Sequence, residues 1–166
     1  MTATTIPEFK IARRFAAPVE AVFDAWADQE KMAQWSGPVG SKVEIIDGEV
    51  VQGSRSISRT AGEGFPAMHS LCFWREITPH SRIVWEQSFC DELGNKTGAP
   101  FFEHWPLTLL TTVELVARGD QTELTLTWTP IEYTPEALDE FARQMASMTG
   151  GWGGSFDKLE AFLAGD

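Results

Sequence analysis

The sequence has few of the residues that carry common enzymatic chemistry. Its 166 residues include two cysteines, three histidines and one tyrosine. His69, His80 and His104 do not stand at metal-ligand spacing, and neither an H-E-x-x-H nor a C-x-x-C motif occurs. No pair of carboxylates has a spacing that argues for acid–base work, and no catalytic set is visible. The sequence therefore predicts no metal, no cofactor and no assigned catalytic residue.

Positive charge is also scarce. Thirteen Lys and Arg stand against 24 Asp and Glu, which gives a net charge of −11. Nucleic acids and anionic membranes are both recognised through basic residues, so we expect neither as a partner. The glycine-rich "TGGWGG" lacks the lysine of a phosphate-binding loop, which argues against a nucleotide.

Export and membrane signals are absent from the sequence pattern. The N-terminal "MTATTIPEFK" has neither the basic nor the apolar region of a signal peptide. No apolar run approaches the ~20 residues needed to cross a bilayer. With two cysteines and no export signal, the sequence favours free thiols and a cytoplasmic location.

Large apolar rings are plentiful. Seven Trp and eleven Phe accompany a hydrophobic fraction of 43%. The length suits one domain over residues 1–166, with a core spanning about 8–163.

The N-terminal third predicts a strand followed by two short helices. Residues 8–16 alternate apolar and polar, as in a strand with one buried face. Pro18 suits the first position of a helix, and Asp28 suits the N-cap of a second helix that ends near Trp35.

Residues 41–130 predict antiparallel strands joined by turns. Asp47-Gly48 predicts a two-residue hairpin. Around Gly119-Asp120, alternation places Leu115 opposite Leu124, with one apolar and one polar face. Two more cross-strand pairs are expected there, Val113 with Leu126 and Thr111 with Trp128.

A third hairpin is expected around Pro79-His80. Its register places Trp74 opposite Trp85, Cys72 opposite Gln87, and His69 opposite Cys90. Cys72 and Cys90 then point to opposite faces of the sheet, where they cannot form a disulfide.

The C-terminal segment predicts one long helix. Thr134 is the expected N-cap, with Pro135 at the first position. Apolar residues recur at three- and four-residue steps through the glycines at 150, 151, 153 and 154 without losing phase. We therefore expect the helix to continue past them, and two interpretations of the glycines stay open: close packing around Trp152, or a bend over a cavity.

Four phrases follow one another along the chain: "FAAPVEAVFDAWADQEKMAQW", "WREITPHSRIVWEQSF", "LTTVELVARGDQTELTLTW" and "MTGGWGGSFDKLEAFL". In this order they resemble the family related to the activator of the 90-kDa heat-shock protein ATPase, within the START-like (SRPBCC) superfamily. The resemblance implies an α+β helix-grip fold, in which an antiparallel sheet of six to seven strands wraps around the long C-terminal helix. It also implies a deep cavity between sheet and helix, which superfamily members use for apolar ligands.

Candidate ligand-binding residues follow from this expectation. Trp74 and Trp85 form one wall if their face points inward, and Trp128 and Trp152 complete an aromatic box. The other candidates share the helix stripe or a titratable ring near the cavity: Met145, Met148, Phe156, His69 and His104.

Three functions compete at this point. The first is binding of a small apolar or aromatic molecule. The second is a cyclase- or hydratase-type enzyme, in which His69, His104 or a glutamate points into the cavity. The third is a co-chaperone-like interaction module, for which a chaperone partner has no sequence support. The loop that carries Phe101, Phe102 and Trp105 suits either a homodimer contact or a cover over the cavity mouth.

Overall fold

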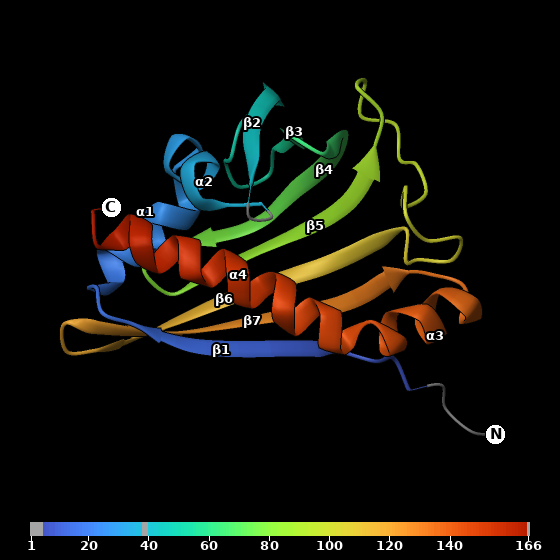
Figure 1. Ribbon diagram of the computed structural model, residues 1–166. Helices are drawn as coiled ribbons and strands as arrows, with labels where there is room; N and C mark the ends of the chain where they lie inside the picture. Colours follow the sequence, from blue (N-terminus) through green and yellow to red (C-terminus); the bar gives the residue numbers. More distant parts are fainter. Residues whose placement is uncertain (1–4, 38–39, 166) are drawn as a thin grey trace.

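A seven-stranded antiparallel sheet curves around one long helix in the computed structural model, which describes residues 5–37 and 40–165 (Figure 1). The strand order is β1-β7-β6-β5-β4-β3-β2. The strands are β1 (Phe9–Phe15), β2 (Ser41–Gly48), β3 (Arg55–Gly62), β4 (Phe65–Thr78), β5 (Arg82–Cys90), β6 (Thr108–Arg118) and β7 (Gln121–Glu132). The helices are α1 (Val19–Ala27), α2 (Gln29–Trp35), α3 (Pro135–Arg143) and α4 (Met145–Leu163). The expected α+β helix-grip fold is confirmed.

Two of the three expected hairpin registers are confirmed. Leu115 pairs with Leu124 and Thr111 with Trp128 across β6 and β7. Trp74 pairs with Trp85 across β4 and β5, and a bulge after Trp74 shifts the register by one residue towards the turn. The alternation predicted these registers because a shift by one residue would bring the polar face into the core.

The expected hairpin tip at Asp47-Gly48 is wrong. Both residues still pair within the ladder, and the connection between β2 and β3 is residues 49–54. Val50 in this connection is buried in the core, which draws the chain away from a tight turn. Gly48 has φ +79°, and a Cβ there would lie 2.1 Å from the carbonyl oxygen of Arg55. The glycine therefore marks a close backbone approach inside a strand and not a turn.

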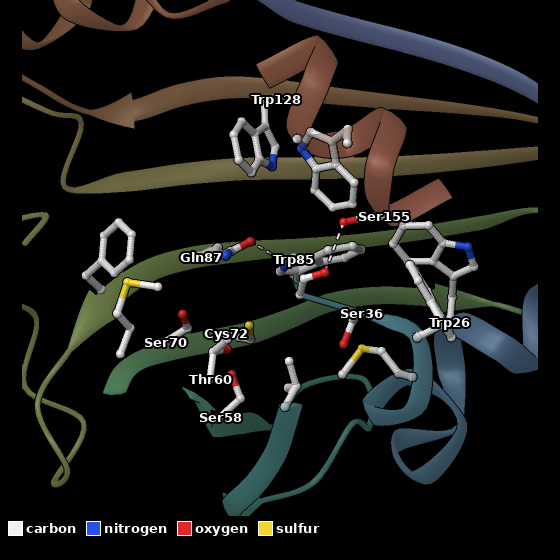
Figure 2. Close-up of a pocket in the computed structure, with 18 of the residues that line it drawn as sticks. Trp26, Ser36, Ser58, Thr60, Ser70, Cys72, Trp85, Gln87, Trp128 and Ser155 are labelled. Atoms are coloured by element: carbon white, nitrogen blue, oxygen red, sulfur yellow. Dashed lines mark hydrogen bonds between the residues drawn. The ribbon is translucent and has the colours of Figure 1, made fainter. Parts of the chain in front are cut away.

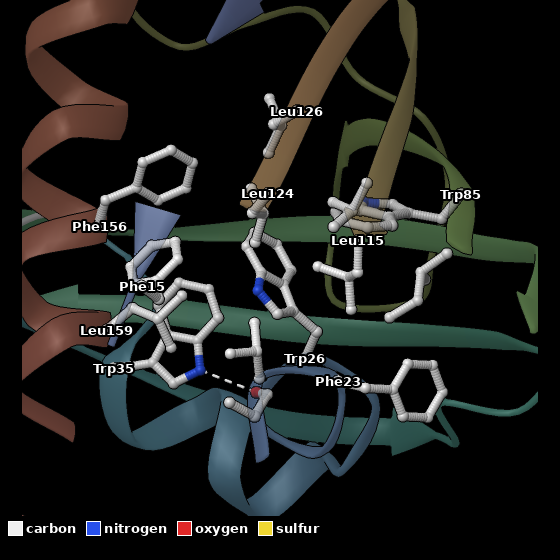
Figure 3. Close-up of a cluster of buried hydrophobic side chains, with 14 of the residues drawn as sticks. Phe15, Phe23, Trp26, Trp35, Trp85, Leu115, Leu124, Leu126, Phe156 and Leu159 are labelled. Atoms are coloured by element: carbon white, nitrogen blue, oxygen red, sulfur yellow. Dashed lines mark hydrogen bonds between the residues drawn. The ribbon is translucent and has the colours of Figure 1, made fainter. Parts of the chain in front are cut away.

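The two short helices begin close to their expected positions. Asp28 caps α2, since its carboxylate accepts from the backbone N–H groups of Glu30 and Lys31. Pro18 is the N-cap of α1, one residue before its expected place. The indole N–H of Trp35 donates to the carbonyl oxygen of Ala25 at 2.8 Å, which fixes α2 against α1 (Figure 3).

The single C-terminal helix expected from the sequence is two helices. Thr134 caps α3 as expected. The chain breaks helical geometry at Gln144 (φ −92°, ψ 5°), and α4 then runs unbroken through all four glycines. The break lets α3 turn away along the end of the sheet while α4 lies across its concave face (Figure 1).

The glycines of α4 are not required by close packing. A Cβ at Gly150, Gly151 or Gly153 would meet no atom within 4 Å apart from chain neighbours and the helix itself. Space for side chains is therefore open along this part of α4, which excludes the interpretation that they admit close packing at these three positions.

The core lies between α4, the two short helices and the sheet (Figure 3). Phe15 on β1 meets Phe156 on α4 edge to face, with 5.7 Å between ring centroids. Arg13, on the same face of β1, donates to Asp157 at 2.8 Å, and its guanidinium lies over the Phe156 ring. Edge strand β1 thus holds α4 by an ion pair above an aromatic contact.

Within the described part of the chain, no helix is both long and apolar enough to cross a bilayer.

Candidate functional site

A cavity of about 410 Å³ lies between the concave face of the sheet, α4 and the end of α2 (Figure 2). Its volume falls within the ~300–1,000 Å³ that is typical of small-molecule sites. The lining side chains come from eight helices and strands and from the loops beside them. They are mainly aromatic, thioether and hydroxyl groups.

The structure brings together five of the nine candidate residues. Trp74, Trp85, Trp128, Met148 and Trp152 all line the cavity. The Trp74/Trp85 face, whose direction the sequence left open, points into the cavity.

The other four candidates lie elsewhere. Phe156 is fully buried in the core, and Met145 packs against the core at the start of α4. Met68, Ser70 and Cys72 line the cavity, so the alternation of β4 directs His69 to the opposite face. His104 is exposed in the loop after β5. Neither histidine borders the cavity, which removes both from the enzyme interpretation.

Tryptophans form one continuous wall of the cavity. The Trp26 and Trp152 rings stack with 6.1 Å between centroids and 25° between planes. Trp128 meets Trp152 edge to face at 5.5 Å, and Trp85 lies 6.0 Å from Trp26 and 5.1 Å from Trp74. Since the rings contact one another, they present a surface and do not surround a central point.

Hydroxyl groups form the opposite wall, and the sequence analysis did not identify them. Ser58 and Thr60 point into the cavity from β3, and Ser70 does so from β4 (Figure 2). Ser58 and Ser70 are Cα partners across the two strands, which places their hydroxyls side by side. None of the three hydroxyls has a hydrogen-bond partner within residues 5–37 and 40–165. The available signal was the alternation of small polar residues in "SISRT" and "MHSLC".

Other polar atoms of the lining divide into bonded and unbonded groups. The Trp74 indole donates to Ser56 at 3.0 Å, and the Trp85 indole lies 3.4 Å from Oε1 of Gln87. Trp128 Nε1 and Ser36 Oγ are buried, and neither has a partner among the residues that the structure describes. Unpaired buried polar atoms of this kind are rare in native proteins.

The cavity lining described by the structure carries no acidic, basic or imidazole side chain. Its only ionisable lining group is the thiol of Cys72, and burial raises the pKa of this thiol to about 12, with a smaller contribution from Cys90. The thiol is therefore neutral at physiological pH. Among the described residues no cluster of His, Cys, Asp and Glu is arranged to hold a metal ion.

The rim of the cavity is tied to α4. The Lys158 ammonium donates to the carbonyl oxygens of Ser36 and Gly37 at 3.1 and 3.2 Å, and burial lowers the pKa of this lysine. Ser155 contacts the same Gly37 carbonyl at 3.4 Å. These bonds hold the loop after α2 against the helix that roofs the cavity.

The long loop after β5, residues 91–107, borders the other end of the cavity. Phe101 lines the cavity, and an aromatic series continues through Phe102 and Trp105 to Phe141 on α3. A smaller cavity of about 90 Å³ lies under this series, beside the main one. The loop therefore covers one mouth, which is one of the two roles expected for it.

A polar cluster fastens this loop to the sheet. The Lys96 ammonium contacts the carboxylate of Glu132 and donates to Thr108 at 2.9 Å. The Thr108 hydroxyl also donates to Glu132 and lies 2.8 Å from that of Ser88. Hydrogen bonds from Lys96 and Thr108 hold the pKa of Glu132 below its usual value.

Comparisons with known proteins agree with this architecture. A solved protein from Arthrobacter aurescens is similar over 97% of this chain and 88% of its own, with TM-score 0.79 and 21% identity. Proteins from Staphylococcus epidermidis (TM-score 0.77, 20% identity, 98% and 92% covered) and Mycobacterium smegmatis (0.76, 18%, 95% and 91%) are similar too. At these identities the likeness shows the fold alone, and no curated protein gives a significant match. The model of the family described as activator of Hsp90 ATPase homolog 1-like protein matches residues 16–164, and the chain belongs to that family.

Proposed function

We propose that this protein binds a small hydrophobic molecule in the cavity between the sheet and α4. The observation that supports the proposal is a cavity of about 410 Å³ whose wall is built from the rings of Trp26, Trp85, Trp128 and Trp152. Apolar pockets with a few convergent polar groups are the usual form of small-molecule sites. Empty space of this size also costs stability, because its lining loses packing contacts.

The test uses N-phenyl-1-naphthylamine, an uncharged probe whose fluorescence rises in apolar surroundings. Gly151 lines the cavity and Gly150 does not, and a Cβ at either glycine would enter open space. Gly151→Leu therefore fills the cavity from α4. Gly150→Leu adds the same side chain one residue away on the same helix and serves as the matched control.

We expect the wild-type protein and Gly150→Leu to bind the probe with similar affinity, and Gly151→Leu to bind it at least tenfold more weakly. Both variants should be at least as stable as the wild type, since each replaces a helical glycine. Equal binding by both variants would place the probe outside the cavity. No binding by the wild type would refute the proposal and favour the interaction-module alternative.

A further inference from the structure

The chemical character of the ligand follows from the two unlike walls of the cavity. Tryptophan rings form one wall, and the hydroxyls of Ser58, Thr60 and Ser70 form the other (Figure 2). We propose, resting on the function proposed above, that the ligand is an uncharged, two-faced molecule. Its flat ring system lies on the tryptophans, and its oxygen substituents meet the three hydroxyls.

The described part of the cavity has no partner for a charged ligand. The cavity lining that the structure describes offers no counter-ion to a carboxylate, phosphate or ammonium group. Burying an unpaired ionised group is strongly unfavourable. The net charge of −11 disfavours an anionic ligand further. A charged ligand would therefore have to keep its charge outside the cavity.

The tryptophan rings are arranged as a surface and not as a cage. A cation-binding aromatic cage needs ring faces directed at a shared centre. Here Trp26 stacks on Trp152 and Trp128 meets Trp152 edge to face, so these rings use part of their faces on one another. The remaining surface suits a flat ring system, which gains from offset or edge contacts with indoles.

The hydroxyl wall offers hydrogen bonds to a ligand. Ser58, Thr60 and Ser70 each present an O–H that donates and accepts, and none bonds to another described residue. A purely hydrocarbon ligand would displace water from these groups and return no hydrogen bond, whereas hydroxyl or carbonyl oxygens would satisfy them.

The test measures displacement of N-phenyl-1-naphthylamine by a matched series of biphenyls. The series contains biphenyl itself, its three monohydroxy isomers, biphenyl-4-carboxylate and the protonated biphenyl-4-methylamine. For the wild type, we expect the best hydroxy isomer to bind at least tenfold more tightly than either charged compound.

Variants separate the hydroxyl wall from general hydrophobic binding. Thr60→Val removes a cavity hydroxyl and keeps the side-chain shape. Thr112→Val makes the same change on β6, whose alternation directs Thr112 to the outer face of the sheet, and is the control. The combined Ser58→Ala, Thr60→Val and Ser70→Ala variant removes all three hydroxyls, and circular dichroism checks its fold.

We expect Thr60→Val and the combined variant to weaken binding of the best hydroxy isomer by roughly three- to tenfold, and to leave biphenyl binding unchanged. Thr112→Val should change neither. Tighter binding of a charged compound, or unchanged hydroxy-isomer binding in both cavity variants, would overturn the inference and leave the binding function standing. Failure of the wild type to bind the naphthylamine probe or any biphenyl would refute the binding function itself.

Discussion

Replacing the glycines of α4 by alanine should stabilise the protein. Gly150, Gly151 and Gly153 lie inside a helix and have no positive φ, and a Cβ on each would meet nothing within 4 Å. Glycine costs a helix interior about 1 kcal/mol relative to alanine, mainly through the entropy of the unfolded chain. Nothing in the surroundings of these three positions offsets that cost.

The expected magnitude follows directly. Each single Gly→Ala variant should gain about 0.8–1 kcal/mol, and the triple variant about 2–3 kcal/mol if the effects add. For a domain of this size 1 kcal/mol corresponds to roughly 2–4 °C, so the triple variant should melt about 5–10 °C higher. Urea unfolding at 25 °C and differential scanning calorimetry measure both quantities.

Gly48→Ala is the contrasting control. Its φ of +79° and the carbonyl oxygen of Arg55 at 2.1 Å from the added Cβ make any side chain strained there. This variant should lose well over ~1 kcal/mol. If the α4 variants were unchanged or less stable, the reasoning would be refuted, since α4 would then need its glycines for a reason other than packing.

Three further predictions concern the cavity and its surroundings. Trp152→Ala should cost about 2–4 kcal/mol in urea unfolding, less than a fully buried tryptophan, because Trp152 is only partly buried; an unchanged midpoint would show that its ring contacts are not stabilising. The carboxylate of Glu132 has a lowered pKa in the folded protein, so its contribution to stability is present above its usual pKa of 4.5 and is lost as the pH falls through the lower folded pKa. Glu132→Gln should therefore reduce the fall in unfolding free energy at acid pH. An unchanged fall would show that Glu132 does not cause it. The pKa of about 12 at Cys72 predicts that this thiol reacts with a disulfide reagent at pH 8 orders of magnitude more slowly in the native protein than in denaturant. Timed labelling followed by peptide mapping measures both rates. Fast labelling of Cys72 in the native protein would show that burial does not protect the thiol.

Local patterns predicted the strand registers well and the chain breaks poorly. The β6/β7 pairing follows from alternation on both strands, because a shift by one residue would turn Leu124 and Leu126 away from the face that carries Val113 and Leu115. Asp47-Gly48 has the composition of a turn but lies in a ladder, because burial of Val50 and the approach of Arg55 decide where the chain reverses. The apolar residues of the C-terminal segment keep their helical spacing across Gln144, so the sequence does not indicate the break between α3 and α4. That break depends on where the sheet ends.

The residues of the candidate site were likewise predicted only in part. Helical periodicity placed Met148 and Trp152 on the face towards the sheet, but Phe156, one turn further along, packs on Phe15 instead of bordering the cavity. Periodicity identifies the buried face of a helix and cannot say where along it the core ends and a cavity begins. The serines of β3 and β4 were missed because small polar residues have the same pattern whether they face water or an enclosed space.

The sequence by itself determined the order of strands and helices as far as Gln144, the cross-strand partners of the two long hairpins and the cap of α2, because turn chemistry, alternation and capping are local properties. Only the tertiary structure decided that the sheet curves around α4, that the Trp74/Trp85 face is concave and that hydroxyls oppose a tryptophan wall. These features depend on accumulated strand twist and on the angle at which α4 crosses the sheet. Both arise from packing between residues that lie far apart in the chain.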